Sequence, residues 1–588
     1  MKKKGLHIAF YGLVLLLAVP ALQLQFGLFR EKPLNGAFTL AEKPVFSKET
    51  WMDGSFQRNV EQYLKDNSGF RNFMVRFQNQ LDYILFRQAN AQGVVIGKNG
   101  QLFEYDYIRS WLTLDYPGDS FVEKKLTRAA YVKEFLKKEK NIDLVIVFEP
   151  GKASFYPEYI PDEYSGEKSG PSTYERYRNK AIEIGLGFTD LQEYFMQLKP
   201  DAQYPLFPPY GTHWSVYGMK YAADSMLKLI EEERGIRFSG YGYGTDTPET
   251  SKKPRDTDDD VLKTMNLLFP MKGKTLAYPA FSFGTTDQEE KPMVLTVADS
   301  YYWNIFNAGI PRELFDNEAF WYFNTLVYPD HYLKPTFTND LNIREEVEKQ
   351  DVIFLMVTER FVHKFDWRFT DQLFHLYAPG WMNDPVYDKI NDIMQLETWY
   401  EEMIEKSQNT GLSLEQVLIN EGKFLYHRED TTGYLLEYGM EHYSRMISAD
   451  SGWMAHVREK ARAKNISDEE MLRNDAAYMF NLEHPELFSI HTAWHDAMKK
   501  LAADPAAMDR LKSEAVKKHW DFERYLRHEA WVLYKNEELL KTREAILSNP
   551  GWYRDIKQKA AEKGITVDEM INMDAIYLFD QKHSQFNF

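Results

Sequence analysis

A serine and a histidine in this chain stand where nucleophilic catalysis requires them. Ser300 follows the apolar run Met293–Val297 and precedes a helical segment, so it is predicted to lie at a strand-to-helix turn. At such a turn the backbone N–H groups of the helix start can stabilise an oxyanion. His213 lies in a proline-rich loop just before another helix, where it is expected to be exposed and its charge can be tuned. Taken alone, each residue also has a plainer interpretation, Ser300 as a helix N-cap and His213 as an ordinary loop histidine.

Other polar and aromatic side chains could complete such a site. Glu359 and Arg360 end the apolar run Val352–Val357, where they form either a site pair or a surface ion pair. Aromatic side chains also gather in sequence around His213. They form either a platform that stacks on sugar rings or the edge of a core. These side chains are Tyr204, Phe207, Tyr210, Trp214 and Tyr217.

Two further patterns resemble metal sites but lack essential ligands. His491 and His495 are one helical turn apart, but the Glu of an H-E-x-x-H zinc motif is missing. The acidic run from Asp256 to Asp260 lacks the Gly and Glu spacing of a calcium-binding EF-hand loop. We therefore predict no metal site, and we expect the acidic run to cap a helix that begins near Val261.

Short apolar runs alternate with helical patterns between residues 56 and 380, and they supply the elements that would position Ser300 and His213. This alternation predicts an α/β domain of three layers with a mainly parallel sheet. Gly97 to Gly100 is expected to form a tight turn between the first two strands. The expected strands lie near 94–96, 101–103, 142–148, 187–191, 293–297 and 352–357.

Residues 385–588 give only helical patterns, and these repeat. Similar units start near Trp399, Trp453, Ala507 and Trp552. Each unit predicts a helical hairpin whose first helix ends in a left-handed cap and whose second begins with a capping box. The caps are Gly411, Asn465 and Gly564, and the boxes start at Ser413, Ser467 and Thr566. Such hairpins bury their apolar faces by stacking on one another, with the tryptophans expected in equivalent buried positions.

The amino terminus predicts export. Three lysines precede an apolar run from about Ile8 to Phe29, which is long enough to span a bilayer, and residues 31–55 are predicted to be a tether. Basic residues before the run place the amino terminus inside the cell. We predict that residues 1–30 are an uncleaved membrane anchor, with a cleaved signal peptide as the alternative. Either one exports the remainder of the chain.

Composition excludes several classes of protein. The chain has 588 residues with 44% hydrophobic and 15% aromatic content, which is enough for large cores and excludes disorder of the whole chain. A net charge of −17 argues against a nucleic-acid-binding protein. The absence of cysteine removes disulfides, thiolate metal sites and cysteine nucleophiles together.

Several segments, in order, resemble the AlgX/AlgJ-type alginate O-acetyltransferase family, whose core is an SGNH-hydrolase-like domain. The resemblance covers about residues 55–375 and leaves the helical repeats unexplained. Its most specific element is Thr212-His213-Trp214-Ser215 with Tyr217-Gly218. The other elements are Asp66–Asn72, Val95–Phe103, Pro150–Tyr159, Asp299-Ser300 and Glu359-Arg360.

The resemblance implies roles for these residues. Ser300 would be the nucleophile and His213 the general base. The family's third catalytic residue, an Asp two positions before the His, is replaced here by Gly211. Another carboxylate could take that role, a Ser–His dyad could work alone, or the site could be impaired. The supporting candidates are Asp299, Asp190, Glu149 and Arg360, and the candidate substrate-binding residues are Tyr210, Trp214 and Ser215.

The expected function is therefore that of an exported O-acetyltransferase or esterase that acts on a cell-envelope or secreted polysaccharide. It would be periplasmic or extracytoplasmic and anchored to the inner membrane by its first helix. The resemblance implies a membrane O-acyltransferase as the acetyl-donor partner and requires no cofactor, metal or nucleotide. The alternative is a catalytically impaired glycan-binding or assembly-scaffold protein that works through its helical repeats.

Overall fold

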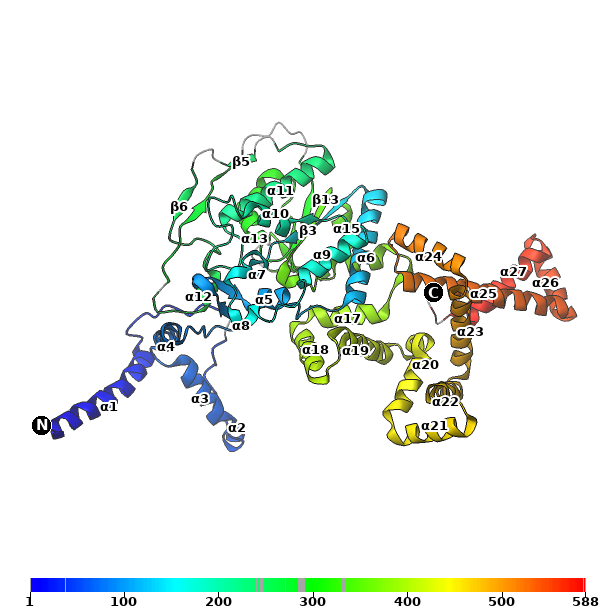
Figure 1. Ribbon diagram of the computed structural model, residues 1–588, viewed down its shortest axis with the longest axis horizontal. Coiled ribbons are helices and arrows are strands. Elements are labelled where there is room, and N and C mark those ends of the chain that lie inside the picture. The colour runs from blue at the N-terminus through cyan, green and yellow to red at the C-terminus, as the bar shows by residue number, and fades with distance from the viewer. Residues whose placement is uncertain are drawn as a thin grey trace.

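The computed structural model describes residues 2–36, 39–238, 241–243, 247–269, 271–283, 291–329, 334–584 and 586. It places an α/β domain between an amino-terminal helical segment and a carboxyl-terminal helical array (Figure 1). The fold class predicted from the alternation of strands and helices is confirmed. The last strand ends at Thr358, and in the described part of the chain only helices and loops follow it.

A seven-stranded sheet forms the centre of the α/β domain, in the order β12-β11-β10-β9-β13-β3-β4. Five neighbouring strands, from β10 to β4, run parallel, whereas β11 and β12 add an antiparallel edge. The parallel strands are β3 (Asp143–Glu149), β4 (Thr189–Asp190), β9 (Val294–Ala298), β10 (Phe320–Tyr322) and β13 (Val352–Thr358). The antiparallel strands are β11 (Leu326–Tyr328) and β12 (Thr336–Phe337).

Alternate side chains of the central strand β13 face two different helical layers, which explains the three-layer architecture. Phe354 and Met356 pack with α5 (Tyr105–Trp111), α11 (Val216–Arg234) and α13 (Tyr302–Asn307). Ile353, Leu355 and Val357 pack on the opposite face. The helices on that face are α6 (Asp119–Phe135), α9 (Thr173–Glu183) and α16 (Phe369–Tyr377). Both faces are buried, so β3 and β13 have continuous apolar sequences rather than alternating ones.

The remaining small strands pair outside the central sheet. The predicted hairpin is present as β1 (Val94–Ile96) and β2 (Leu102–Glu104), with Asn99 in the left-handed region at its turn. Two further pairs were not predicted from the sequence. They join β5 (Tyr241–Tyr243) with β8 (Phe281–Phe283) and β6 (Glu249–Ser251) with β7 (Leu276–Tyr278).

The amino-terminal segment consists of helices around the predicted tether. Helix α1 (Lys2–Phe26) is the one helix in the described part of the chain that is long and apolar enough to cross a membrane. Helices α2 (Lys48–Met52), α3 (Ser55–Asn67) and α4 (Arg71–Phe86) follow it. The tether is not wholly extended, because α2 forms within it, with Ser47 as N-cap. Asn35 also docks on the α/β domain through hydrogen bonds with Asn266 and the Lys263 carbonyl oxygen.

The carboxyl-terminal array contains four helical hairpins, as the repeats predicted. Their helices are α18 (Glu397–Thr410) with α19 (Leu414–Glu429), α21 (Ser451–Lys464) with α22 (Asp468–Glu483), α24 (Pro505–Lys518) with α25 (Phe522–Ser548), and α26 (Pro550–Lys563) with α27 (Val567–Lys582). Helices α20 (Thr431–Ala449) and α23 (Pro485–Ala502) bridge the first three, and α17 (Pro385–Gln395) leads in. The first helix of each hairpin ends in a left-handed residue, at Gly411, Asn465, His519 and Gly564.

The burial predicted for the repeat tryptophans is wrong. Trp399, Trp453 and Trp552 are only half-buried, because each lies in the first turn of its helix. The buried contact lies one turn later, and its side chains are at most 5% exposed. These core residues are Met403, Val457, Leu511 and Ile556. The capping boxes at Ser413 and Thr566 are complete, whereas Ser467 accepts from the Glu470 amide without the reciprocal bond.

The array is fixed to the α/β domain at two places along α6. Arg128 donates to Asp388 of α17, and Lys124 pairs with Asp384 at one end and with Glu523 of α25 at the other. The start of the array at α17 and the later helix α25 therefore both contact α6. This double attachment makes the array and the α/β domain one connected body.

Candidate active site

Ser300 lies at the carboxyl edge of the central sheet, directly after β9 and before α13. The buried carboxylate of Asp299 fixes this turn. Its Oδ1 accepts from the Tyr301 amide at 2.9 Å, and its Oδ2 accepts from the Thr358 amide at 3.0 Å and from the Thr358 hydroxyl at 2.6 Å. Asp299 therefore ties the turn after β9 to the end of the neighbouring strand β13. Burial raises the pKa of the Asp299 carboxyl, and these hydrogen bonds oppose the increase.

His213 contacts Ser300 directly. Its Nε2 lies 2.8 Å from the Ser300 Oγ, although 87 positions separate the two residues. This distance is within the reach that proton transfer requires. The loop around His213 is anchored on both sides. Tyr301 donates to the Thr212 carbonyl oxygen at 2.7 Å, and Tyr107 donates to the Tyr301 hydroxyl at 3.0 Å.

Lys152 binds the same loop through hydrogen bonds to its backbone. Its fully buried Nζ donates to the carbonyl oxygens of Pro208, Pro209 and Gly211, at 2.8, 3.2 and 2.6 Å. No carboxylate forms an ion pair with Lys152 in the described part of the chain. Burial lowers the pKa of this ammonium group to about 7. Three backbone carbonyls thus take the place of a counter-ion and connect Lys152 to the position of His213.

The carboxylate behind His213 is Asp260. Its Oδ2 lies 2.6 Å from the His213 Nδ1, and its Oδ1 accepts from the amides of Thr212 at 2.9 Å and Val261 at 2.7 Å. Ser300, His213 and Asp260 therefore form one hydrogen-bonded line, with the imidazole between hydroxyl and carboxylate. This is the arrangement of a Ser-His-Asp triad, which is recognised by geometry rather than by order in the chain.

The acidic run therefore has a different role from the expected helix cap. The short helix α12 (Asp260–Thr264) does begin at the predicted place, but its N-cap Asp259 makes no capping hydrogen bond through its side chain. Asp260 instead turns toward the histidine loop. Neighbouring Asp258 accepts from the Tyr278 hydroxyl at 2.6 Å, and burial raises the pKa of Asp258 to about 6.

Gly211 explains why the carboxylate comes from this second segment. A Cβ atom at position 211 would lie 2.9 Å from the Asp258 carbonyl carbon and closer still to the Thr257 carbonyl oxygen. A side chain there would therefore occupy the space of the segment that carries Asp260. Position 211 therefore has no carboxylate of its own, and the absence of a side chain there leaves room for the segment that carries Asp260. In the sequence, the glycine between the proline-rich loop and His213 is the feature that could have indicated a carboxylate from another segment.

Two of the predicted substitutes for that carboxylate lie elsewhere. Asp190 accepts from the Tyr174 hydroxyl and the Arg178 Nε and caps α10 (Leu191–Leu198), so its oxygens are occupied away from His213. Glu149 is fully buried at the end of β3, and neither of its oxygens has a hydrogen-bond partner. Burial, and after it the nearby Asp299, raise the pKa of Glu149 well above its usual range, and in the described part of the chain its carboxyl makes no hydrogen bond to His213.

Arg360 belongs to the surroundings of the triad. It pairs with Glu104, and Glu104 also accepts from the Thr212 hydroxyl at 2.8 Å. The guanidinium is thus linked through one carboxylate to the residue before His213. Its partner in the sequence motif, Glu359, turns the other way and accepts from the side chain of Ser154. Burial raises the pKa of the Glu359 carboxyl to about 8.

The expected substrate-binding residues are buried supports. The Trp214 side chain is fully buried and packs against the rings of Phe195 and Tyr301, at centroid distances of 6.0 and 5.0 Å. Ser215 caps α11 and donates to the Pro205 carbonyl oxygen. Tyr210 is 6% exposed and donates to the Lys272 carbonyl oxygen. Of the two interpretations of these aromatic residues, the edge of a core fits their positions, because little of their surface can meet a ligand.

Two cavities lie along the carboxyl edge of the sheet. One of about 570 Å³ is lined by Tyr322, Phe323, Arg360 and Trp367, among others. It is next to the triad because Tyr322 pairs in register with Ala298, two residues before Ser300. The other cavity, of about 470 Å³, lies beyond β3 and includes Ser154. Neither cavity is lined by Ser300, His213 or Asp260, but the first lies beside the strand end that leads to Ser300.

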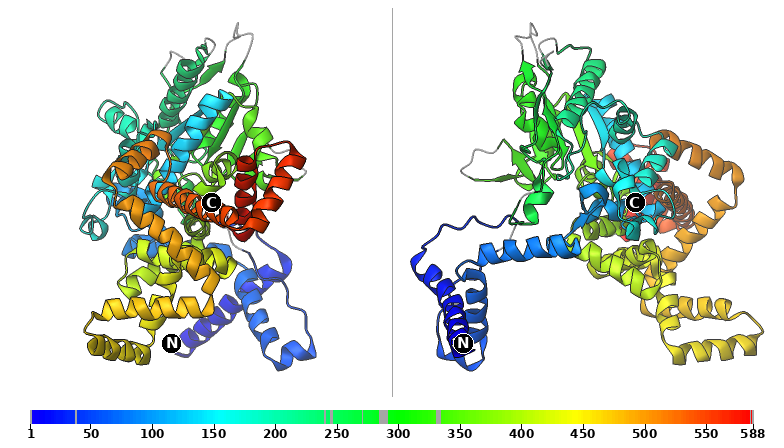
Figure 2. Two further views of the ribbon diagram at one scale, coloured as in Figure 1. Left: turned by 90° about the vertical axis from the view of Figure 1, so that its right-hand side faces the viewer. Right: turned by 60° about the vertical axis from the view of Figure 1, so that its left-hand side comes forward.

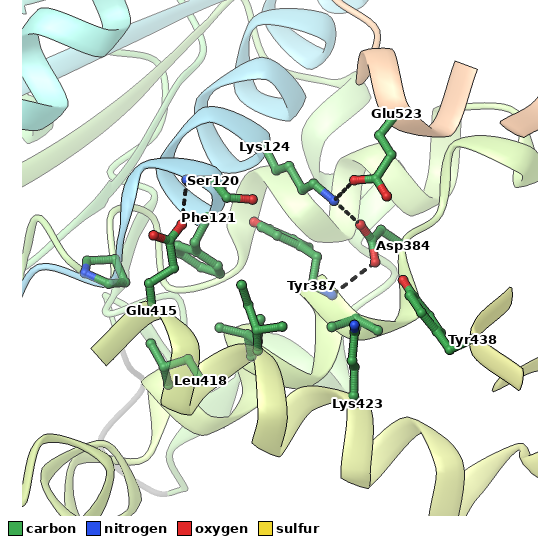
Figure 3. Close-up of a pocket in the computed structure, with 14 residues that line it drawn as sticks. Ser120, Phe121, Lys124, Asp384, Tyr387, Glu415, Leu418, Lys423, Tyr438 and Glu523 are labelled. Carbon is green, nitrogen blue, oxygen red and sulfur yellow. Dashed lines mark hydrogen bonds and ion pairs between the residues drawn. The ribbon is translucent and has the colours of Figure 1, made fainter. Parts of the chain in front are cut away.

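A third cavity, of about 160 Å³, lies between the α/β domain and the array (Figure 3). Its charged side chains already have partners within the protein, and Lys423 pairs with Glu441. Lys124 contacts Asp384 and Glu523, and Glu415 accepts from the Ser120 amide. Its lining comes mainly from α6, α17 and the array rather than from the carboxyl edge of the sheet, so we assign it to the junction of the two domains rather than to catalysis.

The histidine pair in the array supplies too few ligands for a metal. Nδ1 of His491 bonds to the Leu436 carbonyl oxygen, and Nδ1 of His495 bonds to that of His491. Within the described ranges, no group of three or more His, Cys, Asp or Glu side chains converges on a metal position. Burial lowers the pKa of His491 to about 4 and that of His495 to about 3, so both are neutral.

Comparison with known proteins gives the family resemblance. A family model described as "SGNH hydrolase-like domain, acetyltransferase AlgX" matches residues 94–266, a segment that includes His213 and Asp260. The search of curated proteins gave no match. The resemblance predicted from the sequence motifs is thus confirmed for this segment.

Solved structures also resemble the chain. The O-acetyltransferase domain of Pseudomonas putida AlgJ is 19% identical, with a TM-score of 0.31, and the match covers 48% of this chain and 99% of that one. Pseudomonas aeruginosa AlgX is 14% identical, with a TM-score of 0.26, and the match covers 45% and 55%. Bacillus cereus PatB1 is 12% identical, with a TM-score of 0.29, and the match covers 42% and 95%. By the match to the family model, residues 94–266 of this chain are similar to an SGNH hydrolase-like domain of the acetyltransferase AlgX type.

Proposed function

We propose that this chain is an exported O-acetyltransferase that modifies hydroxyl groups of a polysaccharide through an acetyl-enzyme on Ser300. The observation that carries the proposal is the line from Ser300 through His213 to Asp260, with distances of 2.8 and 2.6 Å. A nucleophile, a base and an orienting carboxylate in this geometry support acyl transfer. The similarity of residues 94–266 to an acetyltransferase family supports acetyl as the acyl group.

The first half of the reaction loads the enzyme. His213 Nε2 takes the proton from the Ser300 hydroxyl as Oγ attacks the carbonyl carbon of the acetyl donor. Asp260 accepts the Nδ1–H hydrogen bond and stabilises the imidazolium. The Ser300 N–H makes no hydrogen bond in the described part of the chain, so it is available to the oxyanion. The protonated His213 then gives its proton to the leaving group, and an ester of Ser300 with acetate remains.

The second half transfers the acetyl group. A sugar hydroxyl loses its proton to His213 as its oxygen attacks the acetyl carbon. The collapse of the intermediate returns the proton to Ser300 Oγ and releases an acetylated sugar. Water in place of the sugar would give hydrolysis by the same steps. The cavity next to Tyr322 is the proposed acceptor site, because its half-buried Tyr322 and Phe323 rings can contact a sugar and Arg360 can donate hydrogen bonds to its oxygens.

The donor must reach an extracytoplasmic site. Cytosolic acetyl-CoA does not cross the bilayer, so we propose a membrane O-acyltransferase as the partner that supplies acetyl groups. Helix α1 would keep the enzyme next to that partner at the inner membrane. These steps need no metal or nucleotide.

The alternative function, an impaired glycan-binding or scaffold protein, rested on the missing carboxylate at position 211. Asp260 supplies a carboxylate to the histidine from another segment. We therefore favour the enzyme, although the array still offers surface for protein contacts.

The test uses the full-length chain in detergent with p-nitrophenyl acetate as donor. Mass spectrometry should detect one acetyl group on Ser300, and Ser300→Ala should abolish it. Asp260→Asn should slow acetylation by about 10⁴-fold, since it removes the orienting carboxylate. Asp259→Asn is the matched control, because this neighbouring carboxylate pairs only with Lys263, at 2.6 Å. Absence of a Ser300 adduct in the wild-type protein would favour the scaffold function.

A further inference from the structure

Helix α4 turns its polar face toward the protein. Arg76 and Gln80 are its buried residues. The Arg76 guanidinium donates to the Asn266 side chain at 3.0 Å, and Asn79 donates to the Met265 carbonyl oxygen at 2.9 Å. Gln80 accepts from the Phe269 amide at 2.9 Å. These contacts fix α4 to the α/β domain through the segment that follows α12, and they use the side chains that a solvent-facing helix normally exposes.

The apolar face of α4 points away from the protein. Six large apolar side chains on this face are between 39 and 65% exposed. They are Phe73, Met74, Phe77, Leu81, Ile84 and Leu85. Phe73, Phe77 and Leu81 are four residues apart, and Ile84 and Leu85 follow three and four residues later, so most of these side chains lie on one stripe along the helix. A surface helix of a soluble domain has the opposite arrangement, so this stripe requires a partner.

The start of α4 lies against the end of α1. A Cβ atom at Gly69 would lie 2.6 Å from the Gln23 Cβ, so only glycine permits this approach of the two segments. Glu31, just after α1, accepts from the amides of Phe70 and Phe73, at 2.8 and 3.2 Å. Figure 2 shows α4 bridging this amino-terminal segment and the body of the protein. The exposed stripe therefore begins where the candidate membrane span ends.

We propose that the outer face of α4 lies in the interfacial layer of the bilayer that α1 spans. This inference rests on the proposed membrane anchoring and adds a second, peripheral contact to it. An interfacial helix presents Phe and Leu to the acyl chains and keeps its polar side chains away from them. Here the α/β domain binds the polar side of α4, so docking would hold that domain in one orientation above the membrane.

Two features favour lipid over a protein as the occupant. The six side chains of the stripe include no Tyr, Trp or Arg, the residues that dominate the centres of protein interfaces. Charge points the same way. Residues 30–93 hold nine Lys and Arg against seven Asp and Glu, whereas the whole chain holds 71 against 88. Anionic headgroups repel the acidic body but not this segment, so the membrane would meet the α4 side first.

The absence of cysteine makes a direct test simple. Phe77→Cys and Leu81→Cys are labelled with an environment-sensitive fluorophore in the full-length chain. The protein is reconstituted in vesicles of phosphatidylethanolamine and phosphatidylglycerol. Leu28→Cys reports on the end of α1, and Tyr478→Cys, at a site 65% exposed on the array, is the aqueous control. Unchanged thermal unfolding midpoints verify that the variants fold.

Docking predicts blue-shifted emission at positions 77 and 81, with several-fold more quenching by lipid-attached quenchers than at position 478. Water-like emission at 77 and 81 with lipid contact at 28 would overturn the docking but leave the anchor intact, and it is the result expected if a protein covers the stripe. Water-like emission at all four positions would overturn the anchoring as well. Neither outcome affects acetylation of Ser300, which the detergent assay measures separately.

Discussion

Replacement of Gly211 by alanine should slow acetyl transfer without affecting Ser300 itself. The added Cβ would lie 2.9 Å from the Asp258 carbonyl carbon and closer to the Thr257 carbonyl oxygen, which are backbone atoms that cannot rotate away. An ordinary contact needs about 3.4 Å or more. The segment that carries Asp260 must therefore move by roughly 1 Å, and a misplacement of that size costs about 10²-fold in rate.

That factor corresponds to about 2.7 kcal/mol of transition-state stabilisation. Gly211→Asp should be at least as slow, because its larger side chain meets the same backbone. The restored motif carboxylate would thus harm the enzyme rather than repair it. The assay follows acetylation of Ser300 by p-nitrophenyl acetate. Gly170→Ala is the matched control, since a Cβ atom there meets nothing within 4 Å. A wild-type rate for Gly211→Ala, or a faster rate for Gly211→Asp, would refute the assignment of Asp260.

Three further predictions follow from buried groups. Lys152→Met leaves three loop carbonyls without their donor, so the acetylation rate should fall by about 10-fold or more at unchanged fold, whereas Lys199→Met should not change it. Folded Glu359 has a pKa of about 8 against a usual 4.5, so the folded protein binds more protons between these pH values and loses stability as pH rises. The thermal midpoint of Glu359→Gln, measured relative to that of the wild type, should therefore rise between pH 5 and pH 8. Ile556→Ala should cost about 2–5 kcal/mol in urea unfolding, more than Trp552→Ala one turn earlier, since only Ile556 is fully buried.

Two members of the triad could be predicted because Ser300 and His213 lie in segments that resemble the AlgX/AlgJ-type family, whereas each residue taken alone also has a plainer role. Ser300 ends an apolar strand, and parallel strands present their carboxyl ends at one edge of the sheet. His213 lies in the segment Thr212–Gly218, whose residues match the family motif at several positions. Asp260 could not be predicted in the same way, because its role depends on a contact between segments 47 residues apart. Its local pattern, an acidic run before a helix, indicates a cap equally well.

The limits of the fold prediction have similar causes. The strands β3, β9 and β13 are five to seven residues long and mostly apolar, so they could be located closely. The strands β10 and β11 have three residues each, too few to show a period. In the array, caps predicted the helix boundaries well, but burial depends on how a helix packs. The tryptophans therefore only marked the repeat, while the less distinctive residues one turn later form its core.

The position of Asp260 also connects the two ends of the proposed mechanism. Asp260 begins α12, and the residues just after α12, Met265 and Asn266, receive the hydrogen bonds of α4. Asn266, whose amide side chain binds Arg76, thus lies six positions after Asp260, whose carboxylate orients His213. A helix docked at the membrane and a catalytic carboxylate would then share one short segment. An enzyme that receives acetyl groups at a membrane needs its nucleophile at a fixed height and orientation, and this segment can transmit both from the bilayer to the triad.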